Sequence, residues 1–479
     1  MEHFSSDLTE NIRYIENLFE KDCILRKREF AFGGKSACLF YFDGMVNVEL
    51  INESIMKPLG RVEEIKDGLP FADFTAEKLF ASEIKVTSLI KDAVSAILYG
   101  DTLLLLEKSR LAITVNSKGW RTRGVTEPQN ERVLEGPREG FDEAAMFNVA
   151  MIRRRLQTPD FACEMTRVGR ETNTVVFICY LKSLVNRHTL RVLKKQLEDI
   201  DIDGVLDSNY LTEQITAGAL FRRVGTTERP DVVAARLLEG RVAVVVDTTP
   251  MVITLPYLFS ENFQSDEDYY ISPIIASAGR LMRMLCFVLA ISVSAIYLAL
   301  TTHHFDFLPS EFALTVSVAR SGVPFPSVFE CLILTLIFEI LRETGIRMPQ
   351  NVGHALSIVG GLVVGQSAVE ARIVSAPMLI AVAFSGICGL MVPRLSAAVF
   401  FLRFGMIAVS ALFGLFGILA LASLTLVHLL SIDSFGTDAT SALQNPTPQG
   451  LKDVPVRVGW KRMITRPPIQ NRNVRRKKP

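Results

Sequence analysis

MLCFVLAISVSAIYLALTT, residues Met284–Thr302, contains no charged side chain and is long enough to cross a lipid bilayer as a helix. It opens a region that is almost continuously apolar as far as Leu430. The roughly 280 residues before it are rich in charge and have the pattern of a soluble α/β protein. The sequence therefore predicts an α/β cytosolic region of two tandem subdomains, followed by an all-α multi-pass membrane domain.

Composition and charge exclude some classes of function and indicate the compartment of the N-terminal region. The formal net charge is +1 over 479 residues, which gives no support for nucleic-acid binding. Residues 1–30 are mostly polar and contain no secretory signal, so we expect the N-terminal region to stay in the cytosol. The seven cysteines form no Cys-x-x-Cys pair, which is typical of small buried side chains in a reducing compartment.

An internal repeat organises the soluble region. Gly100–Val115 (GDTLLLLEKSRLAITV) aligns with Gly240–Leu255 (GRVAVVVDTTPMVITL), and each copy follows a predicted helix. A weaker pair, Leu39–Asn47 and Ile178–Asn186, has a similar offset of about 140 residues. A glycine between a helix and a strand is expected, because glycine commonly ends a helix at the C′ position. The alternative to a repeat is chance similarity between two common patterns.

These features predict six segments. We expect an N-terminal amphipathic helix (1–24), a first α/β subdomain (25–119), a connector with a linking helix (120–160), a second α/β subdomain (161–272), a multi-pass membrane domain (273–432) and a basic cytosolic tail (433–479).

Charge around the first membrane segment indicates its orientation. Arg280 and Arg283 precede it, and the loop 303–309 contains no Lys or Arg. The positive-inside rule then places the N-terminal domain in the cytosol. Ser310–Ala319 is too short to span, and Gly and Pro residues at 320–326 break it from Ser327–Leu341, so 310–341 is predicted to be a broken or re-entrant element.

The number of membrane crossings stays open. Pro377–Val392 is an apolar helix, and Leu395–Leu430 fits either one long tilted helix or two short crossings. The tail from Lys452 onward is basic and is expected beside anionic headgroups on the cytosolic side. Five simple crossings would place it outside, so either 310–320 joins a crossing or 395–430 crosses twice.

Small residues form a stripe on Val352–Ala371. Two interpretations compete: close helix packing through small side chains, or the lining of a narrow pore with Val364 as a dewetting gate. Ile358, Leu362, Gln366 and Val369 lie roughly opposite the stripe. The pore-lining candidates are Ser357, Gly360, Gly361, Val364, Ser367 and Ala368.

Charged residues inside the apolar region are functional candidates, because charge is costly within a bilayer. The alternative for each is a structural ion pair, such as Glu339 with Arg342. The candidates are Arg320, Glu330, Glu339, Glu370 and Arg372.

The sequence contains no motif typical of an enzyme active site. Gly34-Lys35-Ser36 has Glu29 where a phosphate loop needs Gly, and His303-His304-x-Asp306 lacks the spacing of a helical metal site. The sequence predicts no enzyme activity, no catalytic residues, no metal and no cofactor.

Several stretches, in order along the chain, resemble the A subunit of the GerA-type spore germinant receptors. The resemblance covers about residues 25–463. It is carried by Tyr99-Gly100-Asp101, Glu127-Pro128-Gln129, Gly136–Phe141 (GPREGF), Arg153-Arg154-Arg155, Phe263–Tyr270 (FQSDEDYY), Gly322–Pro326 (GVPFP), Leu341-Arg342-Glu343 and Ser357–Gly361 (SIVGG) through Gly365-Gln366.

The resemblance implies a location and a function. Members lie in the inner membrane of bacterial endospores, with the N-terminal domain on the core side. The A subunit resembles a ligand-gated channel for monovalent cations that assembles as a ring of five copies. A transporter-like B subunit takes the nutrient, and the C subunit is a lipoprotein. Membrane lipid is a further expected partner, and nucleic acid is not.

Other readings stay open. A SpoVAF-type channel of the dipicolinic-acid release system has the same architecture. A non-conducting scaffold for receptor subunits and a secondary transporter are further alternatives. Two stretches depart from the family pattern: Glu370-Ala371-Arg372, where an Arg in a lumen would oppose cations, and Asp306–Ala319.

Overall fold

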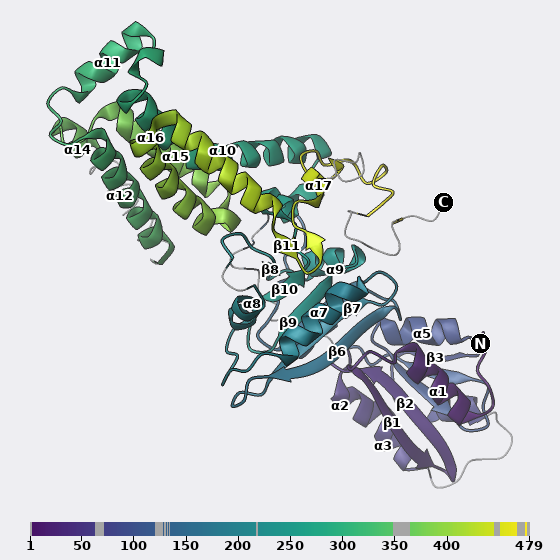
Figure 1. The fold of residues 1–479 in the computed structure, drawn as a ribbon. Helices are drawn as coiled ribbons and strands as arrows, with labels where there is room; N and C mark the ends of the chain where they lie inside the picture. The colour runs from purple at the N-terminus through teal and green to yellow at the C-terminus, as the bar shows by residue number, and fades with distance from the viewer. Residues whose placement is uncertain are drawn as a thin grey trace. The chain divides into compact units, whose positions relative to one another are not determined.

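The computed structural model describes residues 2–62, 71–119, 128, 131, 133, 135–216, 219–347, 365–444, 451–466 and 475–476. The chain divides into two compact units (Figure 1). The first, called the α/β unit, contains 1–257, 433–437 and 463–479. The second, called the helical unit, contains 258–432 and 438–462. The predicted fold class, an α/β region followed by a helical region, is confirmed.

Two five-stranded antiparallel sheets form the α/β unit. The first has the order β1-β2-β4-β5-β3, and the second has the order β6-β7-β9-β10-β8. The first contains β1 (Leu25–Phe32), β2 (Lys35–Phe42), β3 (Ile84–Thr87), β4 (Thr102–Leu106) and β5 (Ala112–Val115). The second contains β6 (Phe161–Val168), β7 (Thr174–Leu181), β8 (Gly225–Thr227), β9 (Val242–Val246) and β10 (Val252–Leu255).

The predicted repeat is confirmed by this shared strand order. In each copy a helix, α5 (Ile90–Leu98) or α9 (Pro230–Leu238), leads through a glycine into the central strand. Gly100 has φ 93° and Gly240 has φ 89°, a left-handed conformation that only glycine adopts without strain. The aligned stretches are therefore β4–β5 and β9–β10.

The remaining helices of the α/β unit cover the sheets. α1 (Leu8–Leu18) is the predicted N-terminal helix, and the Asp7 side chain caps it by accepting from the Thr9 amide at 2.8 Å. The others are α2 (Val48–Ile51), η1 (Asn52–Met56), α3 (Lys57–Gly60), α4 (Phe71–Lys78), α6 (Ala145–Arg155), α7 (Arg187–Glu198) and α8 (Ser208–Thr216).

One hydrophobic core is shared by the two sheets. Arg153, at the end of α6, is fully buried there, and its guanidinium lies 2.9 Å from Asp22 and 4.2 Å from the ring centroid of Phe42. Phe161 of the second sheet packs on the same guanidinium at 5.1 Å. The buried charge is thus paired and enclosed by aromatic faces, which fixes how the two sheets meet.

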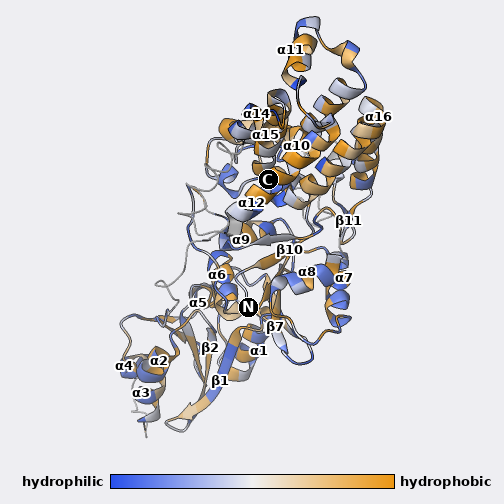
Figure 2. Ribbon diagram, turned by 90° about the vertical axis from the view of Figure 1, so that its left-hand side faces the viewer, coloured by the Kyte–Doolittle hydropathy of each residue, from blue (hydrophilic) through white to orange (hydrophobic). Residues whose placement is uncertain are grey.

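The helical unit consists mainly of hydrophobic residues (Figure 2), and many of its large apolar side chains are exposed. By length and composition, two of its described helices could cross a bilayer, Pro273–Thr302 and Pro393–Leu430. Its elements are η2 (Phe259–Phe263), η3 (Asp266–Tyr269), α10 (Pro273–Thr302), η4 (Phe305–Phe307), α11 (Ser310–Arg320), α12 (Ser327–Arg347), α14 (Gly365–Glu370), α15 (Ala376–Leu390), η6 (Pro393–Leu395), α16 (Ser396–Leu430) and α17 (Ser441–Gln444).

Contacts fix the directions of these helices. α15 runs antiparallel to α10, because the Ser385 hydroxyl donates to the Ala290 carbonyl at 2.8 Å while Ser375 lies near Tyr297. α12 runs parallel to α15. Near the starts of both helices Glu330 accepts from Ser375 at 2.5 Å, and further along both helices the Phe338 ring lies against Gly386.

α16 reverses direction within itself. Gly414 has φ 60° and ψ −143°, which no α-helix contains. A Cβ on Gly405 would lie 3.4 Å from Leu421, and one on Gly417 would lie 2.6 Å from Val409. These residues could not meet along one straight helix, so 396–430 is a helical hairpin with arms of about 25 Å. Of the two alternatives left open, the structure favours two passes.

The C-terminal segment is only partly the free basic tail that we expected. Asp433–Ser434 (β11) and Thr437–Asp438 (β12) form a two-stranded hairpin. Arg457 is 4% exposed and donates to the Ile271 carbonyl at 2.7 Å, and Arg466 donates to the Leu238 carbonyl at 2.7 Å. For these two arginines the expectation of lipid contact is wrong, because both are buried and donate to internal carbonyls.

Candidate functional site

A buried arginine joins four helices of the helical unit. Arg403 of α16 is 1% exposed and donates to the Ala290 carbonyl of α10 at 2.9 Å and the Ser385 carbonyl of α15 at 3.0 Å. Its third partner is the Glu339 carboxylate of α12, at 2.9 Å. Glu339 also pairs with Arg342 at 2.6 Å, as the spacing predicted. A charge in apolar surroundings is stable only with such pairing.

Glu330 lies in a second polar cluster. It is 1% exposed, and one carboxylate oxygen accepts from both the amide and the hydroxyl of Ser375, each at 2.5 Å. Ser375 is the N-cap of α15, so the carboxylate lies at the positive end of that helix dipole. Glu330 thereby ties the start of α12 to the start of α15.

Three polar atoms near this cluster have no hydrogen-bond partner among the residues described. They are the second Glu330 oxygen, the Tyr297 hydroxyl and Arg320 Nε. Arg320 ends α11, and the charges of Glu330 and Arg320 both act on Tyr297. The cluster therefore lies where α10, α12 and α15 meet the break between α11 and α12.

The break itself lies beside Arg372. Gly322 has φ 91°, and a Cβ there would lie 3.2 Å from Arg372 Nη1. Arg372 also has a left-handed backbone, with φ 55°. The Arg372 side chain is therefore directed at the α11–α12 turn. Glu370 has a different partner, the Gln366 amide at 2.8 Å.

The stripe is described only at its end. Ser357, Gly360, Gly361 and Val364 lie outside the described residues. On α14, Ser367 is exposed, whereas Ala368 packs partly against the apolar core formed by α10, α12, α15 and α16. The pore-lining assignment of these six residues stays a prediction.

A charged cluster at the start of α10 was missed by sequence reasoning. Asp268 of η3 accepts from Arg280 Nε at 2.8 Å and from Arg283 Nη2 at 2.5 Å, and Arg280 also donates to Asp453 at 2.8 Å. Burial raises the pKa of Asp268, but the two arginines outweigh it and hold the pKa below its usual range. The FQSDEDYY stretch contained the signal, since it lies just before two arginines.

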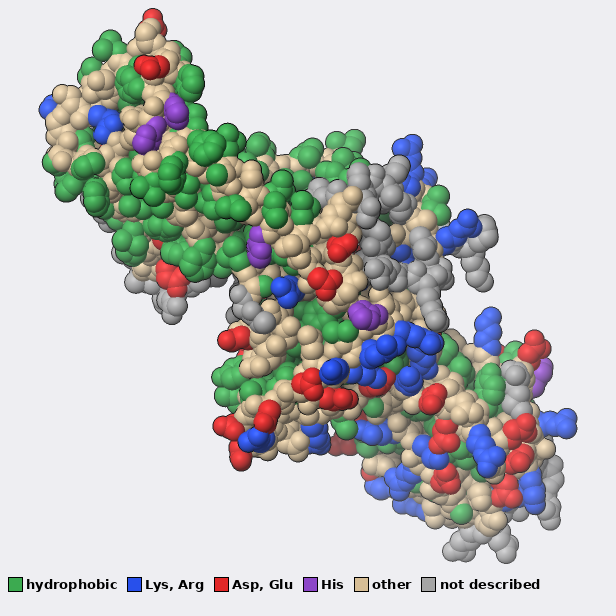
Figure 3. Space-filling view, viewed as in Figure 1, with side chains coloured by type: hydrophobic (Ala, Val, Ile, Leu, Met, Phe, Trp, Pro, Cys, Tyr) green, Lys and Arg blue, Asp and Glu red, His purple; other side chains and the backbone are tan. Residues whose placement is uncertain are grey.

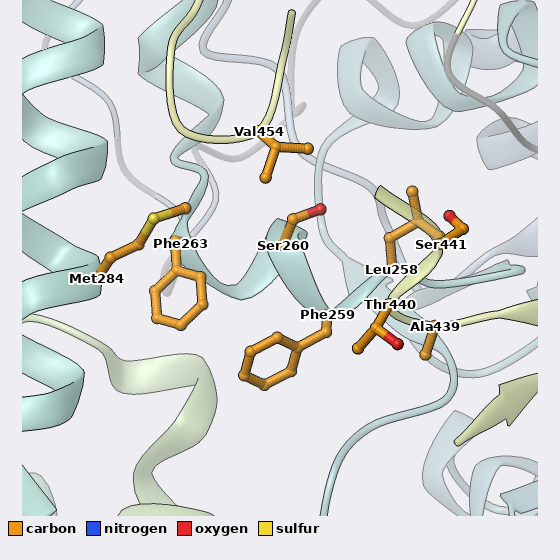
Figure 4. A pocket seen from close by; sticks show the side chains of 9 residues that line it. All are labelled: Leu258, Phe259, Ser260, Phe263, Met284, Ala439, Thr440, Ser441 and Val454. Atoms are coloured by element: carbon orange, nitrogen blue, oxygen red, sulfur yellow. The ribbon is translucent and has the colours of Figure 1, made fainter. Parts of the chain in front are cut away.

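An apolar cavity of about 110 Å³ lies near this cluster (Figure 4). Phe259, Phe263, Met284 and Val454 form its apolar walls, and Ser260, Thr440 and Ser441 contribute hydroxyls. Its polar side chains do not converge on one point, so it identifies no ligand. The described residues contain no cluster of His, Cys, Asp and Glu that could hold a metal ion.

Comparison with known proteins identifies the family. The model described as Bacillus/Clostridium GerA spore germination protein matches residues 12–469. The chain belongs to the GerA family. Its GerA relatives include spore germination protein KA of Bacillus subtilis, which is 37% identical over 88% of this chain and 78% of its own length.

Two further relatives match along most of the chain. Spore germination protein GerQA of Bacillus cereus is 33% identical over 92% of this chain and 88% of its own length. The uncharacterized membrane protein YfkQ of B. subtilis is 34% identical over 98% of this chain and 92% of its own length. A crystal structure of the N-terminal domain of the A subunit of the Bacillus megaterium germinant receptor GerK3 covers 54% of this chain and 97% of that chain, with 27% identity and a TM-score of 0.44.

Proposed function

We propose that this GerA-family chain is the A subunit of a spore germinant receptor in the spore inner membrane. Several copies, five in our proposal, form a ring around a path for monovalent cations. A transporter-like B subunit binds the nutrient, a lipoprotein C subunit completes the receptor, and opening of the path starts germination. The chain itself catalyses no reaction and binds no cofactor.

The polar surface of α14 carries this proposal. Ser367, a member of the small-residue stripe, is exposed there, and Gln366 and Glu370 are exposed on the other side of the helix, where they bond to each other at 2.8 Å. Elsewhere the helical unit exposes large apolar side chains, among them Phe401 at 63% and Leu419 at 67% (Figure 3). Polar groups at membrane depth are stable only where they meet water or protein. A water path enclosed by several copies of 352–371 satisfies this requirement.

The charges at this surface favour cations. The Glu370 carboxylate is exposed at the end of α14, so it contributes negative potential near the proposed path. The Arg372 guanidinium instead lies against Gly322 at the α11–α12 turn. The positive charge that would oppose cations thus lies at that turn.

Potassium efflux from vesicles containing the purified full chain tests the proposal. Val364→Ala removes part of an aliphatic constriction, so it should lower the dewetting barrier and raise efflux at least tenfold without partner subunits. Leu362→Ala, on the opposite helix face, removes a similar volume and should leave efflux unchanged. Equal efflux from both variants and the unsubstituted chain would contradict a pore along this stripe and favour a scaffold.

A further inference from the structure

α7 presents an exposed basic face made of Arg187, Arg191 and Lys195. The three residues are spaced by four, which brings them to one side of the helix. All three are exposed. Figure 3 shows Lys and Arg side chains gathered over α7 on the face that it draws.

This face has no internal counter-charge. In the part of the chain that the structure describes, none of its three members forms an ion pair. The neighbouring Lys194 differs, because it pairs with Glu164. Burial raises the pKa of Glu164, yet its bonds to Lys194 and Tyr180 hold the pKa below the usual range. The fold thus neutralises one lysine of α7 and leaves the adjacent one free.

The position of Arg187 also opposes helix stability, whereas Lys195 lies in the last turn, where a basic side chain suits the helix dipole. The first turn of α7 contains Arg187 and His188 and no acidic residue. The positive end of a helix dipole favours acidic side chains and disfavours basic ones. A local rule that is broken without an internal gain is expected at a functional or strained site. The sign of the charge favours an anionic partner there.

The location of α7 along the chain identifies the partner. The Thr189 hydroxyl of α7 donates to the Phe435 carbonyl at 3.0 Å, and the His188 ring lies against Gly436. Phe435 is the fifth residue after Leu430, the end of α16. Five residues of extended chain span about 18 Å at most. If α16 ends at the membrane surface, the start of α7 lies within that distance of the headgroups.

A second exposed basic residue, Arg222, lies near the hairpin that begins at Asp433. Ser434 donates to the Arg223 carbonyl at 2.6 Å, and the adjacent Arg222 is exposed. The hairpin itself contains two exposed acidic residues, Asp433, which accepts from the Gly436 amide at 3.0 Å, and Asp438. Positive charge from α7 and from Arg222 lies beside the 433–437 segment.

We propose that the basic face of α7 binds the anionic headgroups of the membrane that α10 and α16 span. Each Lys or Arg near an anionic surface is attracted within about one Debye length, roughly 8 Å at physiological salt. The contact holds the α/β unit at the cytosolic leaflet, so the charge of the lipid affects the position of that unit. The inference depends on α16 crossing the bilayer but not on ion conduction.

Amine labelling of the full chain in nanodiscs tests this contact. Acetylation of Lys195 is followed by mass spectrometry in discs of phosphatidylcholine alone and in discs with one third phosphatidylglycerol. Lys85, whose side chain is 72% exposed on β3, is the internal reference. We expect Lys195 to react at least threefold more slowly in the anionic discs, Lys85 to be unchanged, and 1 M salt to abolish the difference.

Two double variants separate charge from fold. Arg187→Gln with Arg191→Gln should remove most of the protection of Lys195. Arg28→Gln with Arg110→Gln, exposed arginines outside this face, should leave it unchanged. Equal Lys195 rates in the two kinds of disc would overturn the proposal. If those equal rates were also slow, they would show that a protein surface covers α7 instead of lipid.

Discussion

Arg403 and Glu339, 64 positions apart in the chain, form a 2.9 Å ion pair inside the helical unit. The same guanidinium holds the carbonyls of Ala290 and Ser385. A buried ion pair of this kind adds little net stability but is costly to break, because the remaining charge is left without its partner. Its role is therefore to specify how α10, α12, α15 and α16 pack.

Removing one partner of this pair should be more harmful than removing both. We expect Arg403→Met to destabilise the helical unit by about 3–5 kcal/mol, since Glu339 then stays buried with only Arg342. The double variant Arg403→Met with Glu339→Met should recover most of the loss. Thermal unfolding of the detergent-solubilised chain measures both. Arg342→Met is the control and should cost less, because the Arg342 side chain is 19% exposed. Additive losses in the double variant would contradict this account.

α12 and α15 approach so closely at Gly386 that a side chain there would overlap the Phe338 ring. Gly386→Ala should therefore cost about 1–3 kcal/mol by overpacking. Adding Phe338→Leu should restore most of the stability. Gly365→Ala is the matched control, because its Cβ would meet only Leu379 at an ordinary 3.7 Å. The same thermal unfolding measurement applies, and a neutral Gly386→Ala would show that these helices are further apart.

Acid should weaken the α/β unit through Glu139, which accepts hydrogen bonds from Arg154 and Arg155. Burial raises the pKa of Glu139, but the two arginines outweigh it and hold the pKa below its usual range. A folded-state pKa below the unfolded value of about 4.3 gives stability that is complete above that pH and is lost as the pH falls further.

Glu139→Gln should therefore lower stability at pH 7 by about 1 kcal/mol, a modest figure because the Glu139 side chain is 34% exposed. The difference from the unsubstituted chain should shrink below about pH 4. Pulse proteolysis in urea at several pH values measures it. Glu171→Gln, at an exposed carboxylate that forms no ion pair among the described residues, is the control variant. A constant difference from pH 7 to pH 3 would show that the Glu139 charge is not involved.

Local patterns predicted much of the fold. The two aligned stretches after Gly100 and Gly240 became equivalent strands, because a glycine in the left-handed region and an apolar run are local signals. α1 and α6 were likewise visible from their apolar spacing. Each of these features depends on residues within about one element of one another.

Features that depend on distant residues were not predictable. Nothing near Arg403 in the sequence points to Glu339, because the two meet only after α12 and α16 pack. The hairpin in α16 was one of two open readings, since Gly405, Gly414 and Gly417 all stood in the segment and only Gly414 turns the chain. Asp268 was missed because its partners Arg280 and Arg283 were assigned only to membrane orientation.

Disulfide cross-linking between copies in native membranes tests most directly whether the 352–371 stripe faces a shared path. Gly361→Cys lies on the stripe and Leu362→Cys on the opposite face, and the unsubstituted chain controls for the seven native cysteines. Under a mild oxidant, the account predicts cross-linked dimers and higher species for Gly361→Cys at many times the yield for Leu362→Cys. A higher yield for Leu362→Cys, or none for either above the unsubstituted chain, would contradict it.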